Sequence, residues 1–286
     1  MPGPDYAPGM EPEIPLAGGN TSAGVVRVGD TVRKPWTPHS PGVLALMGTL
    51  RDRGVDLPAP LGQDEQGRMV TEYVPGALAM DSPPLSRPQL AEVGAMVRLI
   101  HDACAGLSAQ ELGLGPALIP VADADLVCHG DLTPWNLVLG PRWVFIDWDG
   151  AGLSTRAWDL AYSAQAFTLN DVTADPHRAA EDLRAFVLGV DDGVDGADGT
   201  AGLGHEAGAA DGTTGRGYGA DAALRAELAA LLPRRAQAMH DHLERAHRSG
   251  WEPWGSMYLE GHGEHWACVA AHLERHAEIW RDALCS

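Results

Sequence analysis

Residues 128–149, CHGDLTPWNLVLGPRWVFIDWD, constrain the fold of this chain more than any other stretch. Asn136 follows Asp131 by five residues, and Asp147 comes after a further apolar segment. The intervening residues include two apolar runs, 137–139 and 143–146. These runs have the length of short strands and predict a hairpin. Two carboxylates and a carboxamide in this order around a hairpin are specific, because a buried hairpin with polar turn residues would not need all three groups.

The chemistry that suits these groups is phosphoryl transfer, which depends on alignment and charge neutralisation more than on covalent catalysis. Protein kinases place an aspartate and an asparagine at this spacing on their catalytic loop, and a second aspartate after the next strand. By this comparison, Asp131 orients or deprotonates an acceptor hydroxyl. Asn136 and Asp147 supply the oxygen ligands that Mg²⁺ prefers, and His129 braces the loop.

The segments HGDLTPWN and FIDWD also resemble the motifs of the aminoglycoside phosphotransferase-like family of small-molecule kinases. AWDLA, at 157–161, resembles the segment that follows in that family, and the resemblance extends from Gly18 to about Cys285, outside residues 191–219. It implies a two-lobed protein-kinase-like fold of the α+β class, with ATP in the cleft. It also implies that the lobe connection EYVPG holds adenine, with three residues binding the nucleotide: Glu72, Tyr73 and Val74.

The expected elements divide the chain into two lobes. Residues 16–76 are predicted to form a small β-rich N-lobe, with a hairpin turning at Gly29-Asp30, a helix at 41–54 and a strand at 68–76. Residues 77–286 are predicted to form a mainly helical C-lobe, with helices at 89–106 and 157–170 and two or three more after Ala220.

Two segments lack the pattern of a folded element. Residues 1–15 hold several prolines and no periodicity, so we expect a disordered tail. Residues 191–219 are dominated by Asp, Gly, Ala and Thr. They cannot bury enough apolar area to offset an ordering entropy of about 1–2 kcal/mol per residue. We therefore expect a disordered insertion within the C-lobe.

A kinase also needs a cation on a strand of the N-lobe to hold the phosphates of ATP. The strand TVRKP offers Arg33 and Lys34, and alternation sends the two side chains to opposite faces. Lys34 is the only lysine in the chain, which favours Lys34, whereas the resembled family often has an arginine two residues before a proline, which favours Arg33. The helix at 41–54 contains no glutamate to fix that cation. The glycine-rich loop 18–24 offers backbone N–H groups to the phosphates.

The composition limits the partners of the protein. A net charge of −19 argues against a nucleic-acid partner and suits a cationic small molecule, although an acidic surface also serves solubility. No apolar run is long enough for a transmembrane helix, so no membrane is expected. The start of the chain lacks the pattern of a signal peptide, and the four cysteines form no CxxC pair. Both observations favour the cytoplasm.

Aromatic residues and histidines near the C-terminus allow two interpretations each. Trp251, Trp254 and Trp266 either line an acceptor pocket or pack in the core. Four histidines either pack in or near the last helix or ligate a metal, which would need second-shell partners that the sequence does not show: His262, His265, His272 and His276.

We therefore predict a phosphotransferase that uses ATP and Mg²⁺ to phosphorylate a hydroxyl group of a small molecule, such as an aminoglycoside-like antibiotic, an amino alcohol or a sugar. One alternative is a catalytically weak binding or immunity protein with the same fold, which the missing helix glutamate motivates. A protein kinase is disfavoured, because the segment between Asp147 and Asp159 is too short for a long activation segment.

Overall fold

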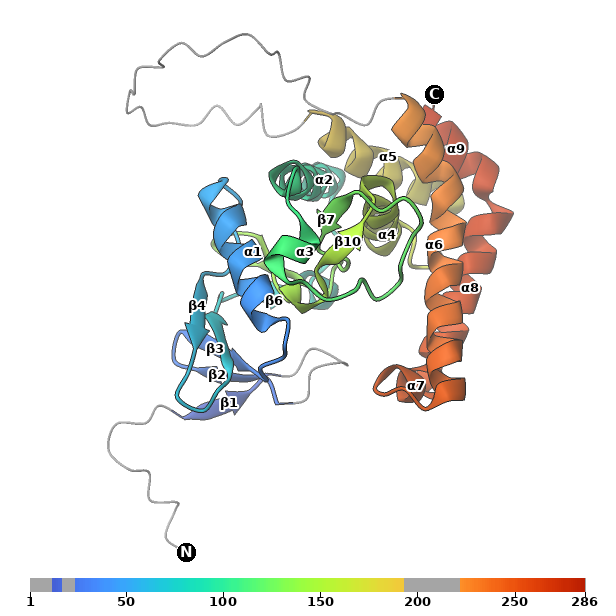
Figure 1. Ribbon diagram of the computed structural model, residues 1–286. Helices are drawn as coiled ribbons and strands as arrows, with labels where there is room; N and C mark the ends of the chain where they lie inside the picture. The colour runs from blue at the N-terminus through green and yellow to red at the C-terminus, as the bar shows by residue number, and fades with distance from the viewer. Residues whose placement is uncertain (1–11, 17–23, 193–221, 286) are drawn as a thin grey trace, which may run out of the picture.

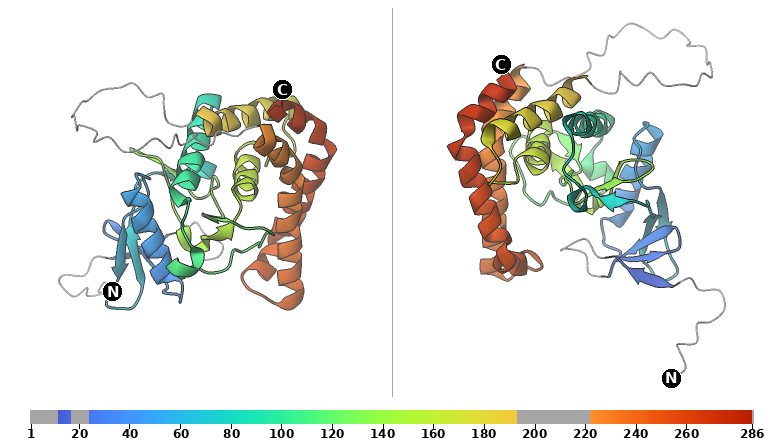
Figure 2. Two further views of the ribbon diagram at one scale, coloured as in Figure 1. Left: turned by 45° about the horizontal axis from the view of Figure 1, so that its top comes forward. Right: turned by 180° about the vertical axis from the view of Figure 1, so that it is seen from behind.

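The computed structural model describes residues 12–16, 24–192 and 222–285 of the chain. The predictions for residues 1–11, for most of the loop 18–24 and for residues 193–219 lie outside the described residues. Figures 1 and 2 show a small lobe with a β-sheet beside a larger helical lobe. Three helices of that lobe lie on the side away from the sheet: α6 (Ala222–Ser249), α8 (Gly263–Arg275) and α9 (Ala277–Cys285). The α+β, two-lobed arrangement predicted from the sequence is confirmed.

The N-lobe is built on a five-stranded antiparallel sheet with the order β1-β2-β3-β5-β4. Its strands are β1 (Glu13–Pro15), β2 (Val26–Val28), β3 (Thr31–Lys34), β4 (Pro60–Gln63) and β5 (Met69–Glu72). The predicted hairpin is confirmed, since β2 pairs with β3 across the turn at Gly29, which has a φ of 58°. The sequence did not indicate β4, because the run PAPLGQ contains prolines and a glycine that disfavour strands.

The prediction of a disordered tail at residues 1–15 is wrong for its last residues. Glu13–Pro15 form β1, which pairs with β2 in the register Ile14 to Arg27. The carboxylate of Glu13 also accepts a hydrogen bond of 2.8 Å from Arg68. The pairing is with residues more than ten positions away, so the local composition of the tail did not reveal it.

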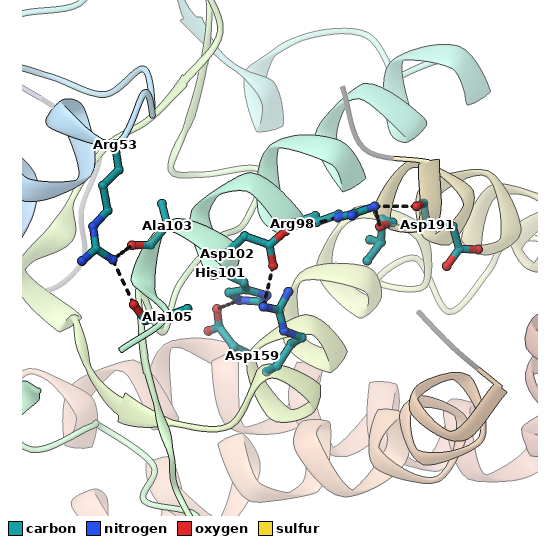
Figure 3. Close-up of polar contacts among 10 residues, drawn as sticks. Arg53, Arg98, His101, Asp102, Ala103, Ala105, Asp159 and Asp191 are labelled. Carbon is teal, nitrogen blue, oxygen red and sulfur yellow. Dashed lines mark hydrogen bonds and ion pairs between the residues drawn. The ribbon is translucent and has the colours of Figure 1, made fainter. Parts of the chain in front are cut away.

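Helix α1 (Ser40–Asp52) is the helix predicted at 41–54. It buries an apolar face that joins the main core: Val43, Leu46, Met47 and Leu50. Directly after the helix, Arg53 donates to the carbonyl oxygens of Ala103 (2.6 Å) and Ala105 (3.0 Å), at the end of α2 (Arg87–Cys104) of the helical lobe (Figure 3). The two lobes therefore share both a core and a polar tether.

Two small sheets hold the stretch 128–149. One contains β6 (Ala77–Leu78), β8 (Leu137–Leu139) and β9 (Val144–Phe145), in the order β6-β8-β9. The other pairs β7 (Leu126–Cys128) with β10 (Gly152–Ser154), in the register Cys128 to Gly152. The hairpin predicted at 137–146 is confirmed as β8–β9. Strands β7 and β10 flank the stretch and pair with each other, so its two ends lie side by side.

The helices of the C-lobe surround these sheets. They are α2 (Arg87–Cys104), α3 (Ala109–Leu112), α4 (Arg156–Thr168), α5 (Pro176–Asp192), α6 (Ala222–Ser249), α7 (Trp254–Met257), α8 (Gly263–Arg275) and α9 (Ala277–Cys285). The helices predicted at 89–106 and 157–170 are confirmed as α2 and α4. Residues 191–192, which we assigned to the disordered insertion, are instead the last residues of α5, and the Asp191 carbonyl accepts a hydrogen bond from Arg98. No helix among the described residues combines the length and apolar character needed to cross a membrane.

Candidate active site

Asp131 lies at the centre of a dense set of hydrogen bonds within its own loop. The Trp135 indole Nε1 donates to both carboxylate oxygens at 3.1 Å, and the Asn136 Nδ2 donates to Oδ2 at 2.7 Å. Burial raises the pKa of Asp131 to about 6, while the hydrogen bonds from Trp135 and Asn136 oppose that rise. A carboxylate with a pKa of this value can accept a proton near neutral pH.

Asn136 and Asp147 come from the two ends of the hairpin. The Ile146 N–H donates to the Asn136 carbonyl at 2.9 Å, which fixes the strand leading to Asp147 beside Asn136. Asn136 donates through Nδ2 to the Asp131 carbonyl and carboxylate, and no hydrogen bond among the described residues uses its Oδ1. Asp147 has a φ of 64° and a ψ of 60°, a left-handed conformation that aspartate tolerates better than most residues. Both side chains line one cavity.

The donor set of Asn136 and Asp147 fits a magnesium ion. One neutral carboxamide oxygen and one carboxylate are hard oxygen ligands, which Mg²⁺ prefers over nitrogen or sulfur. Magnesium is also commonly held by one or two protein carboxylates together with substrate phosphates and water. The unused Oδ1 of Asn136 is an atom that such an ion could take without breaking an existing hydrogen bond.

Lys34 and Arg33 point to opposite sides of β3, as alternation predicts. The Lys34 Nζ lies 2.5 Å from Oδ1 of Asp147 and 2.8 Å from Oδ2 of Asp149. Arg33 instead lies 3.3 Å from the carboxylate of Asp64. Burial favours the neutral amine of Lys34, but the two carboxylates outweigh that effect and raise its pKa. Of the two cations that the sequence left open, Lys34 is the one in contact with the groups of the stretch 128–149.

Asp149 is a residue of the site that the sequence analysis did not assign. It supplies a second carboxylate for Lys34, in a chain whose helix α1 contains no glutamate. Burial, opposed by Lys34, raises the pKa of Asp149, whereas Lys34 holds the pKa of Asp147 low against the effect of burial. The signal was present in the second aspartate of FIDWD.

His129 is fully buried behind the loop. Its Nε2 donates to the Ile146 carbonyl at 3.0 Å, and its Nδ1 accepts from the Asp131 N–H at 3.2 Å. The ring also meets the edge of Trp148 at 4.6 Å between centroids. Burial lowers the pKa of His129, so the neutral imidazole fits this pattern of one donor and one acceptor. These contacts link the Asp131 loop to the strand before Asp147, as expected of a bracing residue.

A buried pair of side chains, His101 and Asp159, holds the loop that carries Asp131. His101 on α2 lies 2.8 Å from Oδ2 of Asp159 on α4 (Figure 3), and Oδ1 of Asp159 accepts the Gly130 N–H at 3.0 Å. Gly130 has a φ of 84°, and a Cβ there would lie 3.2 Å from the Gly150 carbonyl oxygen. The glycine of the HGD motif therefore allows both the turn and the close approach to Gly150.

The predicted nucleotide-binding residues at the lobe connection have different environments. Glu72 accepts the Ala59 N–H at 2.9 Å and is paired with Arg142, so its side chain is already engaged. Tyr73 lies beneath the guanidinium of Arg27 and donates its N–H to the Asp30 carbonyl. Val74 is buried in a small apolar cluster with Val138 and Val144. Of the three, Val74 has a backbone N–H that no hydrogen bond uses among the described residues.

A cavity of about 780 Å³ opens beside the loop. Asp131, Asn136 and Asp147 line one end, which we call the catalytic end. A second part of the lining, which we call the helical end, comes from α4, α6, α7, α8 and the segment between α7 and α8: Trp158, Asp159, Tyr162, Arg235, Met239, Leu243, Trp254, Met257, Glu260, His262, His265 and Trp266.

The aromatic and histidine residues predicted near the C-terminus are placed as follows. Trp254 and Trp266 line the cavity, whereas Trp251 is 52% exposed and packs against His242. The four histidines considered as metal ligands do not form a cluster of three potential ligands in the part of the chain that the structure describes. The group that does meet this criterion is His101, Cys128 and Asp159, whose His–Asp hydrogen bond serves the loop.

Comparison with known proteins supports the resemblance seen in the motifs. A family model described as the phosphotransferase enzyme family matches residues 105–196, which include Asp131, Asn136 and Asp147. The predicted resemblance to the aminoglycoside phosphotransferase family is thereby confirmed. A comparison with curated proteins found no match.

Three solved structures share the fold. A choline/ethanolamine kinase family protein from Mesorhizobium loti is 17% identical, with a TM-score of 0.51, and the match covers 95% of this chain and 93% of that one. A mutant of aminoglycoside 2′-phosphotransferase-IIIa in complex with GDP is 14% identical, with a TM-score of 0.53 and coverage of 91% and 93%. The amicoumacin kinase hAmiN, in complex with AMP-PNP, Ca²⁺ and Ami, is 12% identical, with a TM-score of 0.55 and coverage of 92% and 89%. At these identities the likeness shows the fold, which is that of protein-kinase-like small-molecule kinases.

Proposed function

We propose that this protein is a phosphotransferase that moves the γ-phosphoryl group of ATP to a hydroxyl group of a small molecule. The observation that carries the proposal is the convergence of Asp131, Asn136, Asp147 and Lys34 at one end of a cavity large enough for a substrate. The three neighbours of the same fold, which their names describe as kinases or a phosphotransferase, support the same class of reaction.

In this proposal Asp131 acts on the acceptor. Its carboxylate orients the acceptor hydroxyl and takes its proton as the hydroxyl oxygen bonds to the γ-phosphorus. The bond from the γ-phosphorus to the bridging oxygen breaks, and that oxygen leaves with ADP and the electron pair. Trp135 and Asn136 hold the carboxylate in one orientation before the acceptor arrives, so less ordering remains to be done in the transition state.

Asn136 and Asp147 would hold Mg²⁺, and the ion would offset the negative charge of the phosphates. Lys34 would hold phosphate oxygens from the N-lobe side. Lys34 is paired with Oδ1 of Asp147, so contact between Lys34 and phosphate would require it to exchange that carboxylate for the nucleotide. We therefore expect a weak affinity for ATP alone and a strong dependence of nucleotide binding on Mg²⁺.

The lobe connection completes the nucleotide site in this proposal. The unpaired N–H of Val74 supports binding of adenine by the backbone of residues 72–74. The apolar cluster of Val74, Val138 and Val144 supports an apolar surface next to it. Glu72 and Tyr73 would contribute through the backbone and through the position of the connection, since their side chains are engaged with Arg142 and Arg27.

The alternative of a binding or immunity protein was motivated by the absence of a glutamate in α1. Asp147 and Asp149 supply the carboxylates that fix Lys34 in its place. The geometry therefore favours the enzyme over the alternative.

The test is a panel of small hydroxyl compounds, which includes aminoglycosides, amino alcohols, sugars and hydroxy acids. Each is incubated with ATP and Mg²⁺, ADP release is followed, and products are examined by mass spectrometry for an added phosphoryl group. Asp131→Asn serves as the control for contaminating kinases. We expect acceptor-dependent ADP release by the wild type alone. If no compound increases ADP release and titration detects no binding of ATP–Mg²⁺, the proposed function is wrong.

A further inference from the structure

Arg235 on α6 is a buried cation at the helical end of the cavity. It is only 4% exposed, yet neither Nε nor Nη1 has a hydrogen-bond partner. No ion pair to it occurs among residues 12–16, 24–192 and 222–285 either. Its guanidinium instead lies on the ring of Tyr162, 3.8 Å from the centroid, and 5.5 Å from that of Trp158.

An unpaired buried guanidinium is costly, because the charge has lost water without gaining an anion. Burial lowers the pKa of Arg235, but an arginine in a protein stays protonated. Contact with Tyr162 offsets only part of the cost, since a cation–π contact is weaker than a charge-assisted hydrogen bond to an anion. The fold therefore keeps a charge there that Asp131 and Asp159 favour through space but that no described residue pairs directly.

The nearest carboxylates are already committed to other groups. Asp131 accepts hydrogen bonds from Trp135 and Asn136, and Asp159 accepts them from His101 and the Gly130 N–H. Both carboxylates act on Arg235 through space, but neither forms a hydrogen bond with it. The Nε and Nη1 donors of Arg235 thus have no acceptor among the residues that the structure describes.

The surroundings of Arg235 in the cavity define what would bind there. Trp158 also lines the cavity, and its buried indole Nε1 has no hydrogen-bond partner among the described residues. The remaining helical end is largely apolar, with residues that include Met239, Leu243 and Met257. Its acidic residues are Asp159, which is hydrogen-bonded to His101 and to the Gly130 N–H, and Glu260.

We propose that Arg235 binds an anionic oxygen group of the acceptor, and that the substrate is an amphipathic hydroxy acid or a hydroxylated phosphate ester. This inference rests on the proposed function, since it names the class of acceptor for the same site. A guanidinium pairs with carboxylate or phosphate through two parallel hydrogen bonds, so both sources share one chemistry. The hydroxyl of this acceptor would lie at Asp131, its apolar body along α6 and α7, and its anionic group would remain chemically unchanged by phosphoryl transfer.

A different role for Arg235 makes a different prediction. The positive charge of Arg235 lowers the pKa of Asp131, so its loss could act on catalysis alone. In that case every acceptor would lose turnover by the same factor, and the pH profile would move. Recognition of an anion would instead reduce binding of anionic acceptors and leave neutral and cationic ones unchanged.

The test compares acceptors that differ in one group. A series of ω-hydroxy acids of increasing chain length is matched with the ω-hydroxy amides, the ω-amino alcohols and the monophosphate esters of the corresponding diols. Binding is measured by isothermal titration calorimetry without nucleotide, and turnover is measured separately with ATP–Mg²⁺. The proteins are the wild type, Arg235→Met, which removes the charge at similar length, and Arg235→Lys, which keeps the charge without the planar fork. Arg234→Met is the matched control, because Arg234 is the next residue of α6 and is exposed.

We expect the wild type to bind the hydroxy acid or the phosphate ester at least about tenfold more tightly than the amide and the amine of the same length. Arg235→Met should abolish this preference, Arg235→Lys should keep part of it, and Arg234→Met should keep all of it. The relative affinities of the acids and the phosphate esters decide between the two sources of the anion.

The inference is overturned if the wild type prefers the amide or the amine throughout, if it binds no anionic member of the series, or if Arg235→Met lowers turnover equally for all acceptors. The comparison within the wild type needs no variant to fold. Anion binding without any ATP turnover would contradict the proposed function and leave the preference for anions standing. Phosphorylation of neutral or cationic acceptors without a selective effect of Arg235→Met would leave the function standing and remove this inference.

Discussion

The polar groups at the two ends of the cavity differ in whether they have hydrogen-bond partners within the protein. At the catalytic end, Asp131 and Asn136 are hydrogen-bonded to each other, and Asp147 is paired with Lys34. At the helical end, Arg235 and Trp158 have buried donors without acceptors among the described residues. Under the proposed function, the groups assigned to the reaction are oriented by their neighbours, whereas the group assigned to substrate recognition is left for the substrate to pair.

The largest expected effect comes from substituting Asp131 at the catalytic end. Asp131→Asn keeps the size of the side chain and removes the proton acceptor, so we expect phosphoryl transfer to fall by about 10²–10⁴. The affinity for ATP–Mg²⁺ should stay close to that of the wild type, because Asp131 is assigned to the acceptor. Steady-state rates and nucleotide titrations check the two halves of this prediction.

The matched control for that variant is Asp52→Asn, which changes an exposed aspartate at the end of α1. It should alter neither the rate nor the affinity. An unchanged rate of transfer in Asp131→Asn would show that the carboxylate has no role in the reaction, and the distinction between the two ends of the cavity would lose its basis.

Substitution of Asp159, which is hydrogen-bonded to the loop that carries Asp131, should have the next largest effect. Asp159→Ala removes the acceptor of the Gly130 N–H and the partner of the buried His101. A buried polar group left without its partner costs roughly 1–3 kcal/mol, so the free energy of unfolding should fall by about that amount. Urea denaturation measures the loss, and Asp125→Ala, at an exposed position before β7, provides the control. Equal stability of the two variants would mean that the loop holds its shape without Asp159.

The catalytic end could be predicted from the sequence because its chemistry is local. Asp131, Asn136 and Asp147 lie within one stretch of chain, and the hairpin between them is marked by two apolar runs. The glycine of HGD and the aspartate of AWDLA could likewise be recognised as parts of a motif. Their hydrogen bond could not, because it forms only when α4 packs beneath the loop.

The helical end was not predictable in the same way. Arg235 is one of several arginines in a helix whose sequence shows only an amphipathic pattern, and its burial depends on the packing of α6 against Tyr162 of α4. The net charge of the chain suggested a cationic ligand, which describes the average surface and not this wall. Strand β1 was missed for a related reason, since it is ordered by pairing with β2 and not by its own composition.

Substitutions of Lys34 and Arg33 test whether strand β3 contributes a side chain to the catalytic end. Lys34→Met should raise the dissociation constant of ATP–Mg²⁺ by about tenfold, because a charge-assisted contact to phosphate is lost. Arg33→Met should change it little, since Arg33 faces Asp64 on the other side of the strand. Competition with a fluorescent nucleotide compares the two variants directly. A larger effect of Arg33→Met would reverse the assignment of the two side chains.

The apolar part of the helical end should affect acceptor binding alone. Met257→Ala removes apolar surface from the cavity wall, so we expect KM for the acceptor found in the panel to rise several-fold, which corresponds to about 1 kcal/mol. The value of kcat and the affinity for ATP should stay the same. Leu259→Ala is a close control, because Leu259 lies two residues away and is 69% exposed. A fall in kcat without a change in KM would place Met257 with the catalytic groups.

The smallest expected effect is a displacement of the pH profile. Burial raises the pKa of Asp131 to about 6, and a general base must be deprotonated to act, so kcat/KM should fall with decreasing pH below about 6.

The N–H of Trp135 is shared between the two carboxylate oxygens of Asp131, and its hydrogen bonds favour the ionised form. Trp135→Phe removes them, so the pKa of Asp131 should rise and the acid limb should move to higher pH, by less than about one unit. Trp251→Phe, at an exposed tryptophan outside the cavity lining, should leave the limb in place. A limb that stays at the same pH in Trp135→Phe would show that the titrating group is not Asp131, since no other carboxylate accepts a hydrogen bond from this indole among the described residues.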